Sequence, residues 1–179
     1  MPEYIYNQRL ESLRLITRHL TLEDINIWSE YFKDKEAIRY IPDFGFNSDF
    51  DKAQHMIEKQ LARYKEKRFG LQVLLNKKTK EFIGLCGLLT QEVDGQKEIE
   101  VGYHLFKKYW GQGYATEAAK LFIDYAFKNK VSTSVISVID TGNIKSQRVA
   151  EKNGLTIEKQ TKLLDLESVY IYRIKDNGI

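Results

Sequence analysis

Residues 109–118 read YWGQGYATEA, and this stretch decides the fold more than any other part of the chain. It follows an alternating pattern typical of a strand and precedes a helix pattern with Ala118, Phe122 and Ala126 on one face. Gly111 and Gly113 let the main chain turn sharply and bring its N–H groups close to a ligand. The following helix adds the unpaired donors of its first turn and the positive end of its dipole. The stretch therefore predicts an anion site, suited to a phosphate or a diphosphate.

The rest of the chain reads as strands and helices without a linker or an internal repeat. Hydrophobic periodicity predicts the order β-α-α-α-β-β-β-α-β-α-β-β. Asp94 and Gly95 mark a tight hairpin, and Gly154 is the residue expected just after a helix. Strands are expected at residues 13–19, 69–75, 81–89, 97–106, 134–139, 156–163 and 166–174, and helices at residues 21–33, 35–40, 49–67, 115–126 and 143–153.

Composition indicates a folded protein with a single domain over residues 1–179. The formal net charge is +3 and the lysines are scattered, so no nucleic-acid partner is expected. No apolar run approaches the roughly 20 residues that span a bilayer, and residues 1–10 lack the apolar core of a signal peptide. Cys86 is the only cysteine, so no intramolecular disulfide can form. We therefore expect a cytoplasmic protein that does not associate with a membrane.

Three kinds of phosphate-binding loop compete for the glycine-containing stretch. A P-loop needs two glycines five residues apart followed by Lys and Ser or Thr, and this chain has no such sequence. The dinucleotide-binding fingerprint needs a third glycine where this chain has Thr116, and hairpin-connected strands before the loop conflict with a doubly wound parallel sheet. The third kind is the loop that binds acyl-coenzyme A.

Two motifs carry a resemblance to a known family. Residues 111–115, Gly-x-Gly-x-Ala, and residues 143–155, NIKSQRVAEKNGL, together resemble the Gcn5-related N-acetyltransferases (GNAT). Residues 13–24 and 110–118 are similar to the branch that includes the ribosomal-protein N-terminal (alanine/serine) acetyltransferases. The resemblance covers residues 13–174. It implies an α/β fold with a mixed, mostly antiparallel seven-stranded sheet, helices on both faces, and a parting of the strands that end near Phe106 and Ile139.

The same resemblance implies an enzyme that uses acetyl-CoA as its co-substrate. The acetyl group would pass to a primary amine by direct transfer in a ternary complex. The acceptor stays open between a protein N-terminal α-amine and a small-molecule amine such as a polyamine, an amino acid or an aminoglycoside. A non-catalytic protein that binds acyl-CoA is a further interpretation. The resemblance leaves a monomer and a homodimer equally open.

Acetyl transfer to an amine requires a base, because a protonated amine has no lone pair. Glu100 is the candidate, since it lies on the strand that leads to the phosphate loop and many relatives place a glutamate base on that strand. The alternative is that Glu98 and Glu100 form the solvated face of a half-exposed strand. The resemblance further implies that Ser146 contacts the cofactor and protonates the leaving thiolate.

The other cofactor contacts follow from the same resemblance. A main-chain N–H near Leu105 or Phe106 is expected to stabilise the oxyanion. Asn143 is a favoured helix N-cap, and the resemblance implies that it also contacts the pantetheine arm or orders water. The diphosphate is expected to bind at Gly111, Gln112, Gly113, Tyr114, Ala115 and Thr116.

A few residues invite functional interpretations that the pattern only partly supports. Cys86 lies in an apolar strand and is expected to be a buried structural thiol. His19, His55 and His104 have no metal-ligand spacing, so no metal is expected, although His104 either lines the acceptor site or is a surface histidine. Trp28 is expected in the core, whereas Phe44 and Phe46 are candidates for the acceptor site.

Overall fold

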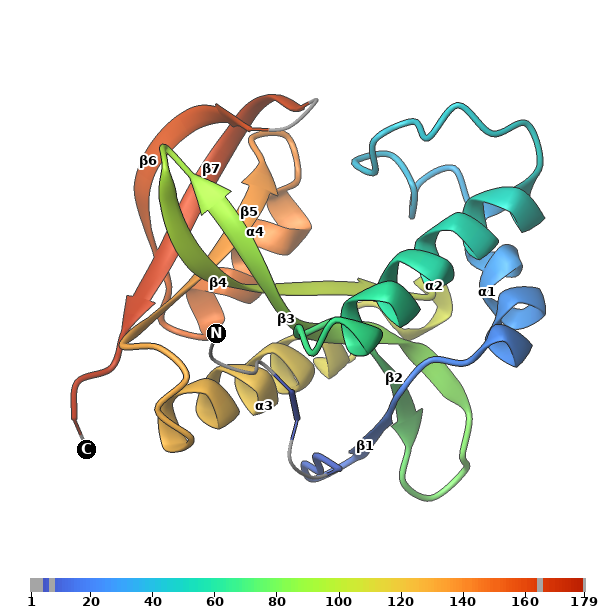
Figure 1. The fold of residues 1–179 in the computed structure, drawn as a ribbon, viewed down its shortest axis with the longest axis horizontal. Helices are drawn as coiled ribbons and strands as arrows, with labels where there is room; N and C mark the ends of the chain where they lie inside the picture. Colours follow the sequence, from blue (N-terminus) through green and yellow to red (C-terminus); the bar gives the residue numbers. More distant parts are fainter. Residues whose placement is uncertain (1–4, 7–8, 164–165, 179) are drawn as a thin grey trace.

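The computed structural model of the chain describes residues 5–6, 9–163 and 166–178, and one twisted sheet organises them (Figure 1). Its strands are β1 (Leu15–Arg18), β2 (Gln72–Asn76), β3 (Phe82–Val93), β4 (Gln96–Leu105), β5 (Ser134–Asp140), β6 (Thr156–Leu163) and β7 (Leu166–Lys175). They pair in the order β1-β2-β3-β4-β5-β7-β6, and every neighbouring pair is antiparallel except β4 and β5. The predicted mixed, mostly antiparallel seven-stranded sheet is confirmed within the described residues.

Helices cover both faces of the sheet, as predicted. On one face, α1 (Ile25–Phe32) and α2 (Asp49–Lys65) pack over β2 and β3 around Trp28, which is fully buried. On the other face, α3 (Tyr114–Lys128) packs against β3 and β4 through an apolar stripe that includes Phe122. The last helix, α4 (Ile144–Lys152), contacts α3 and β5. The core therefore has two layers, one on each side of β3 and β4.

Local side-chain contacts explain where the first helices begin. The short 3-10 helix η1 (Leu22–Asp24) starts α1, and Asp24 accepts a hydrogen bond from the main-chain N–H of Thr21 at 2.9 Å. The hydroxyl of Ser48 accepts a hydrogen bond from the N–H of Asp51 at 3.0 Å and caps α2. The helices predicted at residues 21–33 and 49–67 are therefore present with slightly different ends.

The helix predicted at residues 35–40 is wrong, because this segment is a run of turns. The carboxylate of Asp34 accepts hydrogen bonds from the N–H groups of Glu36 and Ala37 at 2.9 and 3.1 Å. A short polar side chain that binds nearby main-chain groups competes with helical hydrogen bonds. Pro42 follows immediately and cannot extend a helix. Two α-helices, rather than three, therefore precede β2.

The two parallel strands at the centre of the sheet part soon after they meet. Their register contains the single pair Glu100 and Ile136. One residue further along each strand, the Ser137 hydroxyl donates a hydrogen bond to the carbonyl of Val101 at 3.2 Å. Beyond this point the described residues record no further pairing between β4 and β5. The expected parting of the strands that end near Phe106 and Ile139 is confirmed.

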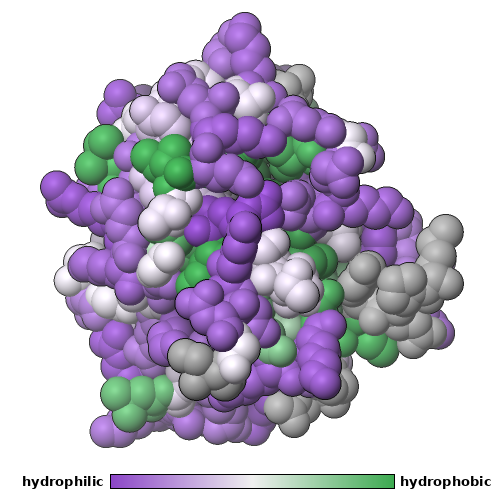
Figure 2. Space-filling view, turned by 90° about the vertical axis from the view of Figure 1, so that its left-hand side faces the viewer, coloured by the Kyte–Doolittle hydropathy of each residue, from purple (hydrophilic) through white to green (hydrophobic). Residues whose placement is uncertain are grey.

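No helix in the described ranges is long and apolar enough to cross a bilayer. The face shown in Figure 2 is mostly hydrophilic, and its hydrophobic patches are separate from one another. Among the same residues, no group of three or more His, Cys, Asp or Glu side chains is arranged to hold a metal ion.

Candidate functional site

The glycine-containing loop leads from β4 into α3 and exposes a row of main-chain N–H groups. After the 3-10 helix η2 (Lys107–Tyr109), Gly111 and Gly113 adopt left-handed conformations with φ of +72° and +80°. Gly113 is the N-cap of α3 and brings no side chain to satisfy the first turn. In the described part of the chain, no acceptor pairs with the N–H groups of residues 111–116. These donors and the positive end of a 15-residue helix form a candidate anion site.

Three side-chain contacts hold this loop in place. The indole N–H of Trp110 donates to the carbonyl of Leu105 at 2.8 Å, and the amide of Gln112 donates to the carbonyl of Lys108 at 2.8 Å. Arg14, from the segment before β1, donates to the carbonyl of Gln112 at 3.0 Å. A methyl group added at Gly111 would meet nothing within 4 Å, so one side of the loop stays open.

Tyr114 and Thr116 differ in what they offer to this loop. The ring of Tyr114 packs into the core beneath α3 and its hydroxyl accepts a hydrogen bond from Asn76 at 3.2 Å, so only its N–H faces the anion site. Tyr114 can therefore contribute its main-chain N–H to the turn, and binding of the diphosphate there remains a prediction. Thr116 is half-buried in the first turn of α3, and its N–H belongs to the unpaired set.

Glu100 is buried, with 8% of its surface exposed, at the last point where β4 pairs with β5. Its carboxylate accepts a hydrogen bond from the Gln91 amide at 3.0 Å. Burial raises the pKa of Glu100 to about 7, although hydrogen bonds from Gln91 and from the main chain of Val138 and the charge of Arg63 oppose the rise. A carboxylate with this pKa exchanges protons readily near neutral pH.

The alternative interpretation of Glu98 and Glu100 as a solvated strand face is wrong. Glu98 forms an ion pair with Arg173 at 2.7 Å, and both side chains are about 15% exposed. Gly102, two residues after Glu100, faces Leu71 and Leu89 on the α1–α2 side of the sheet. Because side chains alternate along a strand, Glu100 faces the same side.

Tyr103 contacts Ser146 from the opposite face of β4. The two hydroxyl oxygens lie 2.8 Å apart, and the Tyr103 hydroxyl also lies 3.1 Å from the Ser146 carbonyl, to which it can donate. Asn143 caps α4 by accepting a hydrogen bond from the N–H of Ser146 at 3.1 Å. Burial raises the pKa of Tyr103, so its hydroxyl stays protonated at neutral pH. The sequence pattern missed Tyr103, because it continues the apolar row of Ile99 and Val101 and reads as core.

The two candidate oxyanion donors also differ. The N–H of Phe106 donates to the carbonyl of Ile83 at 3.1 Å, so it belongs to the β3–β4 ladder and is not free. N–H groups alternate in direction along a strand, which turns the N–H of Leu105 away from β3 and toward β5. The expectation for Phe106 is therefore wrong, and the donor role of Leu105 remains a prediction.

The comparisons with known proteins agree with this geometry. Residues 14–156 match the family model described as "Acetyltransferase (GNAT) domain". The chain is 30% identical over 161 residues to the uncharacterized N-acetyltransferase p20 of Bacillus licheniformis, a match that covers 89% of this chain and 88% of that protein. The chain belongs to the GNAT acetyltransferases. The predicted family is confirmed.

Two further similarities to known proteins concern the length of the chain and its fold. The chain is 40% identical over 96 residues to the uncharacterized protein YkkB of Bacillus subtilis, which covers 52% of this chain and only about half (56%) of that protein. The solved structure of RimL, a ribosomal α-N-protein acetyltransferase in complex with coenzyme A, matches with a TM-score of 0.76 at 14% identity over 94% of this chain and 99% of that chain. At this identity the likeness to RimL concerns the fold.

The residues present fit the coenzyme that this family uses. GNAT acetyltransferases take their acetyl group from acetyl-CoA. The unpaired N–H groups of residues 111–116 match the acceptor oxygens of a diphosphate, and no carboxylate lies among them. The parting of β4 and β5 begins next to Glu100 and continues toward this loop. One end of the opening in the sheet therefore holds an anion site, and the other holds a titratable carboxylate.

The remaining predicted residues fall into two groups. Trp28 and Cys86 are core residues as expected, and burial raises the pKa of the Cys86 thiol well above its usual range. His104 is half-buried, its ring lies 6.1 Å from that of Tyr31, and burial lowers its pKa to about 4. Phe44 and Phe46 each lie 5.1 Å from the ring of His55 near the start of α2.

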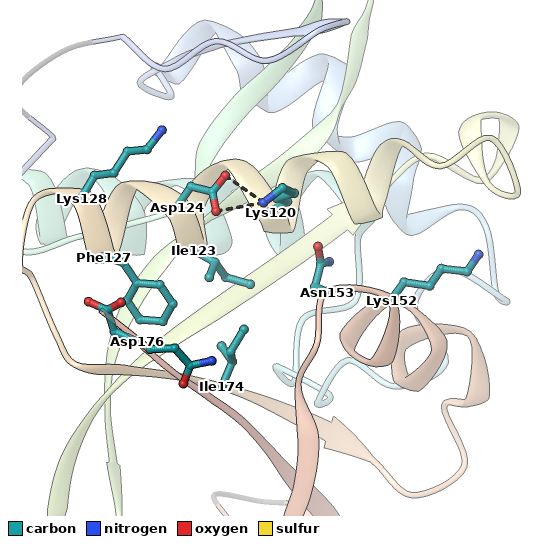
Figure 3. A pocket seen from close by; sticks show the side chains of 10 residues that line it. Lys120, Ile123, Asp124, Phe127, Lys128, Lys152, Asn153, Ile174 and Asp176 are labelled. Carbon is teal, nitrogen blue, oxygen red and sulfur yellow. Dashed lines mark hydrogen bonds and ion pairs between the residues drawn. The ribbon is translucent and has the colours of Figure 1, made fainter. Parts of the chain in front are cut away.

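A separate hollow of about 400 Å³ lies between the C-terminal half of α3 and the ends of α4 and β7 (Figure 3). Ile123, Phe127 and Ile174 form its apolar floor, and lysine and aspartate side chains surround it. None of its lining residues belongs to the phosphate loop or to the group around Glu100. The hollow is therefore distinct from the candidate active site.

Proposed function

We propose that this GNAT protein transfers the acetyl group of acetyl-CoA to a primary amine, directly and in a ternary complex. The observation that carries the proposal is the buried carboxylate of Glu100, whose pKa is about 7, at the start of the opening between β4 and β5. Buried carboxylates with a raised pKa are concentrated at catalytic sites. Residues 1–179 would act as one domain in the cytoplasm.

Acetyl-CoA supplies the thioester, and the residues of this chain supply positioning and proton transfer. The N–H groups of residues 111–116 would bind the diphosphate, and Asn143 would contact the pantetheine arm. Glu100 would accept the proton of the acceptor amine from the α1–α2 side of the sheet. The N–H of Leu105 would stabilise the negative charge that develops on the carbonyl oxygen.

The proton for the departing thiolate would come from the pair of Tyr103 and Ser146. Their hydroxyls lie 2.8 Å apart on the side of the sheet where α3 and α4 pack. Tyr103 is protonated at neutral pH, and a hydrogen bond between the two groups allows either one to replace the proton that the other donates. Base and acid would then act from opposite faces of β4.

For the acceptor, we propose the α-amine of a protein N-terminus. The solved structure of RimL, which shares this fold, is that of a ribosomal α-N-protein acetyltransferase. A polyamine or an aminoglycoside carries several positive charges and is best bound by several free carboxylates. The acidic residues near the start of α2 are instead paired locally: Asp43 with the N–H of Gly45, Asp49 with Lys52, and Asp51 with Ser48.

The test is acetyl transfer by the purified protein to a panel of amines. The panel contains peptides with free N-termini, the same peptides with blocked N-termini and a free lysine, and polyamines, amino acids and aminoglycosides. We expect turnover of the free N-terminal peptides and of none of their blocked counterparts. Turnover of a small amine alone would refute the protein acceptor. Binding of coenzyme A without turnover of any amine would favour a non-catalytic binder.

A further inference from the structure

We propose that Arg14 is a positioning residue for the phosphate groups of the coenzyme, acting through Gln112 and Glu117. The inference rests on the proposed function, because it assumes that the loop binds acetyl-CoA. Arg14 precedes β1 and lies far from the loop in sequence, yet its guanidinium reaches the loop from the β1 side of the sheet.

Arg14 fixes the orientation of the peptide group between Gln112 and Gly113. The guanidinium Nη1 of Arg14 donates to the carbonyl of Gln112 at 3.0 Å, so this oxygen points toward Arg14. In a trans peptide the next N–H points opposite to the carbonyl. The N–H of Gly113 therefore points away from Arg14 and stays unpaired. Without this contact the peptide between Gln112 and Gly113 can rotate, because glycine tolerates a wide range of φ, and it can then present its carbonyl oxygen to the phosphate.

Arg14 also offsets a negative charge beside the loop. Glu117 lies in the first turn of α3, close to the site that must accept the anionic coenzyme. Burial raises its pKa, but hydrogen bonds from Ser12 and from the main chain and side chain of Arg14 outweigh burial, and the net pKa is lowered. Glu117 is therefore negatively charged at neutral pH. Arg14 holds it at 2.7 Å and offsets this charge, which would otherwise repel a diphosphate.

The guanidinium itself is well fixed. It lies over the Tyr114 ring, 4.1 Å from the ring centroid, and the main-chain N–H of Arg14 also donates to Glu117 at 2.7 Å. Its Nη2 lies 3.5 Å from the position that a methyl group on Gly113 would occupy. A planar group held on several sides fixes its partners more rigidly than a flexible ammonium can. Arg14 thus links the orientation of the loop to the neutralisation of Glu117.

The chain offers a matched control in Arg18, on β1. Arg18 forms an ion pair with Asp24 at 2.7 Å, and its side chain is 39% exposed, compared with 37% for Arg14. Both arginines therefore tie the first strand region to a neighbouring element with similar exposure. Only Arg14 touches the phosphate loop. A purely structural role predicts similar effects for Arg14→Gln and Arg18→Gln.

The experiment compares these variants in full-length protein by calorimetry with coenzyme A and by steady-state kinetics. We expect Arg14→Gln to raise the Kd for coenzyme A and the KM for acetyl-CoA roughly tenfold, the usual effect of losing a charge-assisted contact. The kcat at saturating acetyl-CoA should change less than about threefold, because uniform binding is what is lost. The KM for S-acetylpantetheine, which has no phosphate, should stay unchanged. Arg18→Gln should leave all of these constants unchanged.

Two more variants separate the effect of Arg14 on the orientation of the loop from its effect on the charge of Glu117. Arg14→Lys keeps the charge but cannot hold Gln112 and Glu117 together, so we expect an intermediate Kd; it also serves as the test variant if Arg14→Gln does not fold. Adding Glu117→Gln to Arg14→Gln should recover part of the lost affinity, because the uncompensated charge is removed.

An unchanged Kd for coenzyme A in Arg14→Gln would overturn the inference, as would an equal rise in Arg18→Gln or an equal rise in the KM for S-acetylpantetheine. A wild-type protein that binds no coenzyme A would overturn the proposed function itself. The coenzyme A affinity of the variants therefore tests the role of Arg14, and the coenzyme A affinity of the wild type tests the proposed function.

Discussion

Replacing Glu100 with Gln should remove the base and, at the same time, stabilise the fold. General base catalysis contributes typically ~10²- to 10⁴-fold, so we expect kcat/KM of Glu100→Gln to fall by at least about a hundredfold at pH 8. The wild-type kcat/KM should rise with pH and level off above about 7, because the base works only when its carboxyl is ionised. This inflection should disappear in Glu100→Gln.

The stability change follows from the same pKa. The pKa of Glu100 rises from 4.5 to about 7 on folding. At roughly 1.36 kcal/mol for each pH unit, this corresponds to about 3 kcal/mol. Because the folded state holds the proton more tightly than the unfolded state, this stability is fully present below pH 4.5 and is lost as the pH rises through about 7. Above that pH, the wild type bears the cost of a buried charge that Gln does not have.

Urea denaturation of both proteins at pH 5 and pH 8 measures this difference. We expect the free energy of unfolding of Glu100→Gln, relative to the wild type, to increase by about 2–3 kcal/mol between the two pH values. Glu98→Gln is the matched control, since Glu98 lies on the same strand in an ion pair with Arg173 and should leave the inflection in place. A Glu100→Gln enzyme with unchanged activity would refute the assignment of the base. A pH-independent stability difference would refute the raised pKa.

Three further predictions test the site and the core. Gly113→Ala should destabilise the protein by about 1 kcal/mol in thermal denaturation, since Gly113 has a φ of +80°, and should weaken coenzyme A binding in calorimetry; unchanged affinity would argue against the loop as the phosphate site. Tyr103→Phe should lower kcat about tenfold with little change in the KM for acetyl-CoA. Adding Ser146→Ala to Tyr103→Phe should lower kcat by a smaller factor than Ser146→Ala does in the wild type, because the two hydroxyls share one role. Fully additive losses of kcat would contradict a shared proton donor. Cys86 is buried with a raised pKa, so a thiol reagent should label it only after denaturation, and labelling of the native protein would contradict its position in the core.

The strand order and the glycine-containing turn could be predicted from the sequence because their signals are local. Gly111 and Gly113 predict a turn before a helix, and both adopt positive φ in the structure. Asp94 and Gly95 likewise form the predicted turn, with φ of +50° and +76°. Residues 35–40 were predicted wrongly, because their apolar spacing suits a helix while the hydrogen bonds of Asp34 and the following Pro42 do not.

The environment of Glu100 could not be predicted, because it depends on contacts between distant segments. An alternating strand pattern indicates a polar face, and a polar face is usually solvated. Here Gln91 from β3 and the main chain of Val138 from β5 form hydrogen bonds with the Glu100 carboxylate, and the charge of Arg63 from α2 lowers its pKa. The contact of Tyr103 could not be predicted either. A tyrosine in an apolar row of a strand reads as a core residue, and nothing in the sequence indicates that its hydroxyl contacts Ser146 on α4.

The position of the parallel pair explains why several candidate site residues lie on β4. A neighbour paired along the whole of β4 would occupy all the N–H groups on that edge, whereas β5 pairs with β4 at Glu100 alone and then departs. The part of β4 beyond that pair keeps ordered side chains on both faces, since β3 still holds its other edge as far as Leu105. Glu100 therefore faces the α1–α2 side, Tyr103 faces the α3–α4 side, and the N–H of Leu105 points into the opening between them. The next residues carry the chain into the glycine-containing loop, so one continuous stretch places the proposed base, the proposed acid and the candidate phosphate site around a single break in the sheet.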